Sequence, residues 1–496
     1  MSPSFILILI GCYFGMLIVV SRLTSRKASN ATFFLADRSA PWYLVAFGMI
    51  GASLSGITFI SIPGKVGSEA VQFGYMQMVI GYLAGYLFIA YVLLPLYYKL
   101  QLTSIYTYLE QRFGQEAYKT GAFYFLLSRT LGASIRLLLV ANVLQEFVFN
   151  AWNVPFEMTV FISVALIWTY TYRGGIKTII WTDTLQTLFM LLSLGITIYF
   201  VSTELGISEK GIVSTIADSQ YSRWFFFDDF NAGSHFLKQF IGGFFICIGM
   251  TGMDQDMMQK NLACRNIKEA QKNMLSFAAI LFIVNLLFLA LGALLFMYVA
   301  KTGMELPLSE SGRVRTDLLF PTAALRTSMA GAVGVFFLLG LIAAAYSSAD
   351  SALTSLTTSV CVDFINIEKR KKEHQERIRK ITHIAVSVML LLVIIILHHT
   401  LDLTAIDQLI FLAGFTYGPL IGLFLFGILT KKIPTGKGIV FVCLLSPLLS
   451  WWIWNSSVVN EWDYVIGPEL IMLNAVITFL GLLALPSSQT QMQKGH

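Results

Sequence analysis

Charged residues are scarce in this chain. Asp, Glu, Lys and Arg make up 12% of its 496 residues, whereas a soluble domain carries about 25%. Hydrophobic residues account for 56% of the chain, and the mean hydropathy is +0.71. This composition excludes an ordinary soluble domain. It predicts an integral, multi-pass protein of the cell membrane, with the lipid bilayer as its surroundings.

Cysteine and histidine are also sparse, which limits the disulfide, metal and catalytic sites that the chain can form. The five cysteines lie in or beside apolar stretches, without the paired spacing of a disulfide framework or a zinc site. The six histidines form neither a metal-binding cluster nor a nucleophile–base pair. No long soluble stretch interrupts the apolar runs, so an output domain of a sensor is not expected. We therefore expect a protein that is not an enzyme and uses no organic cofactor.

Long apolar runs fill most of the sequence instead. Runs of about 17–25 residues cross a bilayer as helices, and thirteen are predicted. They lie near 4–21, 42–63, 74–98, 120–150, 156–172, 176–203, 236–258, 274–300, 328–362, 379–399, 404–429, 438–456 and 465–485. With the N-terminus outside, 24 basic residues fall on the inner side and 8 on the outer side. This bias predicts an N-out, C-in orientation and explains the net charge of +6 without a nucleic-acid partner.

Glycine interrupts the second and the seventh predicted spans. The second contains Gly48, Gly51 and Gly56, and the seventh contains Gly242, Gly243, Gly249 and Gly252. Interrupted spans at matching places in two halves point to the binding site of a transporter, although close packing through small residues is the alternative. The two spans open two predicted five-helix units, 42–203 and 236–429. These units are preceded by 1–41, joined by an outer loop at 204–235 and followed by 430–496.

The ninth predicted span contains a group of oxygen-bearing side chains. Ser347, Ser348, Asp350 and Ser351 fall within five residues. A carboxylate inside a span is by default a functional-site hypothesis, and such oxygens bind small hard cations. The serines could instead hydrogen-bond to their own helix or to a neighbour. The added carboxylate favours an ion site.

Three further ionisable positions in predicted spans are candidates for a functional role. Arg129 and Arg136 are seven residues apart and share one helix face. Each could hold a substrate carboxylate through two parallel hydrogen bonds, or pair with a buried acid. Asp183 lies about seven residues from the inner end of its span, where interfacial solvation is the alternative to a functional role.

Three motifs together resemble the sodium:solute symporter family, over nearly the whole chain. They are Gly174-Gly175 with Thr182-Asp183 and Gln186, Asp254-Gln255 with Gln259, and the Ser347-Ser348-x-x-Ser351 run. The resemblance implies an all-α fold of the leucine-transporter type, an inverted repeat of five plus five helices with flanking spans. It also implies secondary active symport of a solute with Na⁺ into the cell by alternating access. We expect the protein to function as a monomer.

The resemblance implies two groups of cation ligands. The main Na⁺ site would use backbone carbonyls of Gly51, Leu54 and Ala344 and the hydroxyls of Ser347 and Ser348. A second Na⁺ site, found in some sialate carriers of the family, would comprise Asp183, Ser347, Asp350 and Ser351. Asp350 departs from the family pattern, which has Ser or Thr there. Two carboxylates would over-neutralise one Na⁺ unless one is protonated, so a proton-coupled transporter of the same fold is the alternative.

The resemblance also implies a set of substrate-binding residues. Ser53, Ser55 and Thr58 resemble the polyol-binding stretch of the sialate carriers, Phe73 and Gln77 stand where these carriers have an aromatic residue and a glutamine, and Arg136 stands where they have a carboxylate-binding arginine. The implied solute is a small hydroxylated acid such as sialic acid, or a neutral sugar. Ile62-Pro63 also resembles carriers of monocarboxylates, vitamins and iodide, which remain alternatives.

Overall fold

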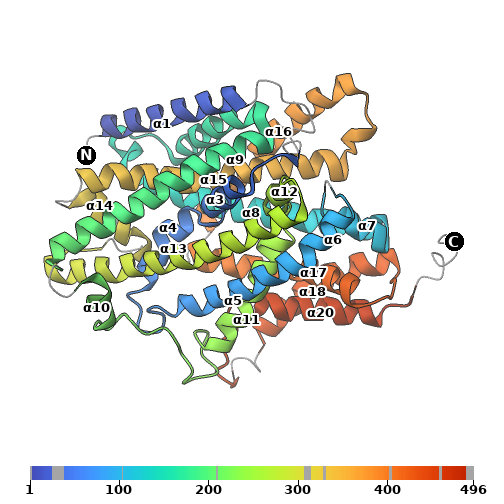
Figure 1. Cartoon of the computed structure of the whole chain (residues 1–496). Helices are drawn as coiled ribbons and strands as arrows, with labels where there is room; N and C mark the ends of the chain where they lie inside the picture. The colour runs from blue at the N-terminus through green and yellow to red at the C-terminus, as the bar shows by residue number, and fades with distance from the viewer. Residues whose placement is uncertain are drawn as a thin grey trace.

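The protein is a bundle of helices (Figure 1). The computed structural model describes residues 3–24, 38–102, 104–207, 211–306, 314–327, 331–400, 405–456 and 461–487. Within these ranges there is no β-sheet, only two isolated bridges. The all-α architecture predicted from the sequence is therefore confirmed.

The helices follow the apolar runs of the sequence. The first half contains α1 (Pro3–Thr24), α3 (Trp42–Ser53), α4 (Gly56–Lys65), α5 (Tyr75–Phe88) continued by η2 (Ile89–Leu93) and α6 (Leu94–Lys99), α7 (Thr107–Phe113), α8 (Gln115–Phe147), η3 (Phe149–Trp152), α9 (Phe156–Leu205) and α10 (Ile212–Ala217). The second half contains α11 (Phe236–Cys247) continued by η4 (Ile248–Gly252), α12 (Gln255–Leu262), α13 (Ile267–Thr302), η5 (Thr316–Leu318), α14 (Leu319–Arg326), α15 (Ala332–Ser359) continued by η7 (Val360–Phe364), η8 (Ile367–Lys369), α16 (Lys372–Thr400), α17 (Ala405–Leu429), α18 (Gly436–Trp454) and α20 (Leu470–Ala484).

Both glycine-interrupted spans are broken in the structure. The chain bends by 58° between α3 and α4, and by 63° between η4 and α12. The predicted breaks are therefore confirmed in both halves. A broken helix leaves main-chain groups without their usual i→i+4 partners, and in a membrane this is tolerated only where protein or a polar cavity supplies new ones.

The helices account for most of the predicted spans. Among the described residues, nine helices are long and apolar enough to cross a membrane, and the two bent pairs raise the total to eleven. Phe156–Thr171 and Leu470–Ala484, at the places of two more predicted spans, are shorter apolar helices. Thirteen spans with an N-out, C-in orientation therefore stay a prediction.

One predicted boundary lies within continuous helical backbone. The sequence separates 156–172 from 176–203 at Arg173-Gly174-Gly175, and the backbone of α9 is helical from Phe156 to Leu205, yet Phe156–Thr171 and Ile176–Leu205 are separate apolar helices. Tyr170 hydrogen-bonds to Asp350, and Asp183 accepts from Ser347. These two α9 positions would lie about 20 Å apart along a straight helix, but both meet one turn of α15, so the two predicted spans are distinct. The side chains of residues 172–175 lie outside the described set, so the first part of the predicted Gly-Gly signature is not placed further.

Helix α15 lies at the centre of the bundle. It packs against α9, α8, α3, α4 and α12, and the labels of these helices gather in the middle of Figure 1. The polar run Ser347–Ser351 is fully buried on α15. The fold thus brings the serines and Asp350 next to both broken helices.

Candidate functional site

The first break exposes main-chain oxygens at Gly51–Ser55. In an uninterrupted helix the N–H of Ser55 would donate to the carbonyl of Gly51, but here it donates to Ser53 at 3.0 Å. Leu54 has φ −78° and ψ 78°, which is not helical. The break therefore releases the Gly51 carbonyl from its usual helical partner, as a backbone ligand for a cation requires.

Gly51 lets α3 lie directly on α9. Its N–H donates to Thr187 Oγ1 at 2.9 Å, and a Cβ at this position would lie only 2.4 Å from the same oxygen. A side chain larger than hydrogen would push α3 away from α9. The same Cβ position lies 3.4 Å from Ser347 Oγ on α15, so three helices meet at Gly51.

The hydroxyl of Ser348 faces the broken helix. Its Oγ lies 3.3 Å from the Ala52 carbonyl and 3.4 Å from the Ala344 carbonyl, to which it donates. The structure thus places Ala344, Ser347 and Ser348 beside the α3–α4 break. All five residues that the resemblance assigns to the main Na⁺ site lie in this region, and Ser348 contacts the break at the Ala52 carbonyl, between Gly51 and Leu54.

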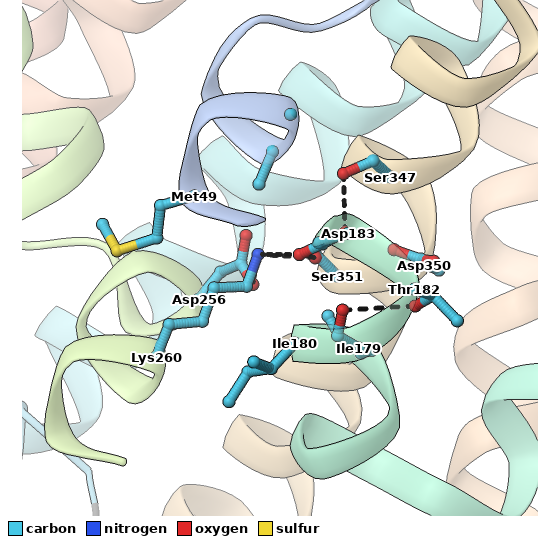
Figure 2. A network of polar contacts seen from close by, with 12 residues as sticks. Met49, Ile179, Ile180, Thr182, Asp183, Asp256, Lys260, Ser347, Asp350 and Ser351 are labelled. Atoms are coloured by element: carbon cyan, nitrogen blue, oxygen red, sulfur yellow. Dashed lines mark hydrogen bonds and ion pairs between the residues drawn. The ribbon is translucent and has the colours of Figure 1, made fainter. Parts of the chain in front are cut away.

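A second polar cluster surrounds Asp183 of α9 (Figure 2). Ser347 donates to Asp183 Oδ1 at 2.6 Å, and Ser351 donates to Oδ2 at 3.4 Å. Lys260 of α12 brings its Nζ to 2.8 Å from Asp183 Oδ2 and to 2.8 Å from Ser351 Oγ. Asp183, Ser347 and Ser351 are 0% exposed, and Lys260 is 1% exposed.

Lys260 is the residue that the sequence analysis missed. Its position just after the seventh predicted span, 236–258, assigns it to the 24 basic residues of the inner side, yet it lies in the protein interior. The second break explains this position, because α12 turns inward by 63° after η4 and carries Lys260 towards α9 and α15. A lysine five residues after the Asp254-Gln255 pair of a broken span was the available signal.

Asp256 links Lys260 to Arg129. Asp256 lies 3.8 Å from Lys260 Nζ and forms a buried ion pair with Arg129 of α8. Asp254 caps α12 by accepting from the N–H of Asp256 at 2.9 Å, and it accepts from the hydroxyl of Tyr417 at 2.8 Å. Arg129 therefore pairs with an internal acid, one of the two roles left open for it.

Asp350 lies outside the Asp183 cluster. Its Oδ2 accepts a hydrogen bond from the hydroxyl of Tyr170 at 2.8 Å, and no ion pair to Asp350 occurs within the described part of the chain. In the view of Figure 2 it lies on the other side of Asp183 from Lys260. The structure thus brings together three of the four residues assigned to a second Na⁺ site.

A cavity opens beside the α3–α4 break. Water-molecule centres can occupy about 100 Å³ of it, which is small beside the roughly 300–1,000 Å³ of typical ligand pockets. Its lining includes Ser53, Leu54, Ser55, Thr58 and Arg136 from the predicted sets, together with Tyr75, Tyr82, Tyr86, Thr251 and Asn285. The three tyrosines share one face of the span that begins with α5, which was a signal for them in the sequence.

Phe73 and Gln77 do not reach this cavity. Phe73 stacks on Trp224, with ring centroids 6.1 Å apart. Gln77 donates to the Ser234 carbonyl at 3.0 Å and accepts from the N–H of Phe226 at 2.9 Å. Both side chains hold the segment before α11 in place, so the structure does not bring them to the other substrate candidates.

Arg136 differs from Arg129 in its pairing. It is 6% exposed and lines the cavity, but among the described residues it forms no ion pair, and its Nε and Nη1 have no hydrogen-bond partner there. A buried guanidinium without a counter-ion is costly. Its fork of donors matches a carboxylate, so the arrangement suits an anionic ligand.

The chain is similar to known sodium-coupled carriers. The family model described as the sodium:solute symporter family matches residues 33–442. The sodium/sialic acid symporter NanT of Aliivibrio fischeri is 27% identical over 478 residues, which cover 94% of this chain and 91% of that protein. The sodium/sialic acid symporter SiaT of Proteus mirabilis is 28% identical over 488 residues, 95% and 94% of the two chains.

A solved structure shares the fold. It is that of a Na⁺-coupled sialic acid symporter in a substrate-bound, outward-open state, and the match has a TM-score of 0.82. The identity is 22%, and the match covers 98% of this chain and 99% of the other. The fold is therefore the leucine-transporter-type arrangement that the resemblance implied.

Proposed function

The chain belongs to the sodium:solute symporter family, and from this premise we propose that it imports a hydroxylated organic acid, such as a sialic acid, together with Na⁺. The unpaired Arg136 at the cavity carries this proposal. A carboxylate on the substrate would supply the missing counter-ion. The hydroxyls of Ser53, Ser55 and Thr58 and the phenols of the α5 tyrosines would hydrogen-bond to a polyol. A neutral sugar would leave Arg136 unpaired.

Sodium would bind where α15 meets the α3–α4 break. We propose that the carbonyls of Gly51, Leu54 and Ala344 and the hydroxyls of Ser347 and Ser348 are its ligands. A cation shared by both elements would hold the broken helix against α15 and so fix the cavity wall formed by Ser53–Thr58. Because binding free energies are linked, Na⁺ would raise substrate affinity, and the substrate would raise Na⁺ affinity by the same factor.

Uptake into proteoliposomes tests the proposal. The purified protein is reconstituted, and uptake of labelled sialic acid is measured under an inward Na⁺ gradient, with an equal K⁺ gradient as the control. We expect accumulation only with Na⁺, and competition by other hydroxylated carboxylates but not by glucose. Uptake that is equally fast with K⁺ would refute sodium coupling. Competition by glucose but not by other hydroxylated carboxylates would refute an acidic substrate.

Proton coupling on the same fold is the second candidate. It is favoured by Asp350, a fully buried carboxyl group that has Tyr170 as a partner but no cation within the described residues. Uptake driven by a pH gradient without Na⁺, and lost in Asp350→Asn, would support it over the sodium mechanism.

A further inference from the structure

The oxygens around Asp183 already hold a cation supplied by the protein. The ammonium of Lys260 lies 2.8 Å from Asp183 Oδ2 and 2.8 Å from Ser351 Oγ. Ser347 donates to the other carboxylate oxygen at 2.6 Å. Asp183, Ser347 and Ser351 are also three of the residues that the resemblance assigns to a second Na⁺ site.

We propose that Lys260 is the resident cation of this second site, so that the protein couples one Na⁺, not two, to each substrate molecule. The inference rests on the proposed sodium symport and concerns its stoichiometry. An ammonium group and Na⁺ carry the same charge, and both seek oxygen ligands. A free Na⁺ at Asp183 would have to sit beside the ammonium, and two like charges at a shared ligand repel strongly in a dry interior.

The charges of the cluster balance without a second sodium. Asp183 and Asp256 carry two negative charges, and Lys260 and Arg129 carry two positive charges. The four side chains are at most 4% exposed, so water does not screen an excess charge there. These four ion-paired side chains are together neutral, so an added Na⁺ would give them a net positive charge.

The backbone holds Lys260 in this position. Asp254 caps the start of α12, with its Oδ1 2.9 Å from the N–H of Asp256. The 63° bend before α12 points this short helix at α9 and α15. Lys260 is thus a cation tethered to α12, the helix after the second break. It binds oxygens of α9 and α15, the helices that pack against α3 at the first break. A second Na⁺ would otherwise bind these oxygens.

The expected consequence is a change in the charge moved per cycle. One Na⁺ with a monovalent acid moves no net charge, whereas two would move one positive charge inward. Each net charge changes the equilibrium accumulation about 50-fold per 100 mV, which corresponds to about 2.3 kcal/mol. A protein with Lys260 in place is therefore expected to accumulate a monovalent acid to a level that does not depend on membrane potential.

The experiment measures the ratio of labelled Na⁺ to labelled sialic acid taken up by proteoliposomes, at zero potential and under a K⁺ diffusion potential. We expect a ratio of one for the unaltered protein, a ratio of one for Lys260→Arg, which keeps the cation, and a ratio approaching two for Lys260→Met. Lys238→Met is the matched control. Lys238 is a buried lysine on α11 that lies 3.9 Å from Glu469, and its removal is expected to leave the ratio at one.

The outcomes separate the two proposals. A ratio of two in the unaltered protein, or a ratio of one in a folded Lys260→Met variant, overturns the role of Lys260 and leaves sodium symport intact. Absence of any Na⁺ uptake with substrate overturns the symport itself. If Lys260→Met does not survive purification in K⁺, its thermal unfolding is followed during Na⁺ titration in membranes. Stabilisation there beyond that of the unaltered protein supports the proposal, and equal stabilisation contradicts it.

Discussion

Replacing Arg136 by glutamine should weaken substrate binding and at the same time stabilise the protein without substrate. Arg136 is buried at the cavity wall and has no ion-pair partner among the described residues. Hydrogen bonds to a charged group contribute about 1.5–3 kcal/mol, so their loss should weaken the affinity for a carboxylate about 10- to 150-fold. Removing an uncompensated buried charge should raise the free energy of unfolding by about 1 kcal/mol or more.

Thermal unfolding in detergent, with and without sialic acid, measures both effects in one assay. Arg136→Gln should unfold at a higher temperature than the unaltered protein without ligand, and should gain less from added ligand. Arg265→Gln is the control, since the Arg265 side chain is 62% exposed and is not among the residues that line the cavity. If Arg136→Gln lowered the unfolding temperature and left the ligand effect unchanged, Arg136 would be a structural residue and the argument for an acidic substrate would fail.

Three further changes test the packing around the two clusters. Gly51→Ala places a Cβ 2.4 Å from Thr187 Oγ1, so it should lower the free energy of unfolding by about 1–3 kcal/mol. Thermal unfolding should show that the second change Thr187→Ala recovers part of this loss. Ser348→Ala should raise the Na⁺ concentration for half-maximal uptake about fivefold, because one hydroxyl ligand contributes about 1 kcal/mol; an unchanged Na⁺ dependence would remove Ser348 from the site. Arg129→Gln leaves Asp256 without its main partner and should cost about 3–5 kcal/mol of stability, which a second change, Asp256→Asn, should largely restore if the ion pair is the cause.

The sequence predicts the fold well because hydrophobic runs and glycine interruptions are local signals. Both bends, at Leu54 and before α12, fall where glycines and polar residues interrupt apolar spans. The division of 156–172 from 176–203 matches two apolar helices, Phe156–Thr171 and Ile176–Leu205, although the helical backbone of α9 continues between them.

The candidate site is predicted less completely, since its residues meet only through the fold. Ser53, Ser55, Thr58 and Arg136 were found from a motif and do line one cavity. Phe73 and Gln77 came from the same comparison of motifs, yet they hold the segment before α11 instead. The direction of a side chain after a break depends on the bend angle, which no local pattern encodes.

Lys260 shows how a count of charges along the chain can mislead. Counting treats every lysine near a span as a mark of the inner surface, but the bend before α12 carries this one to Asp183. Two of the buried cations, Lys260 and Arg136, therefore differ in a testable way. Lys260 is paired with a buried acid, so its removal should destabilise the protein until another cation replaces it. Arg136 has no acidic partner among the described residues, so its removal should stabilise the protein and weaken only the binding of the ligand. The two changes in stability have opposite signs because both side chains are buried and, of the two, only Lys260 has an acidic partner in the described part of the chain. The sign therefore distinguishes a cation that pairs within the protein from one that pairs with the substrate.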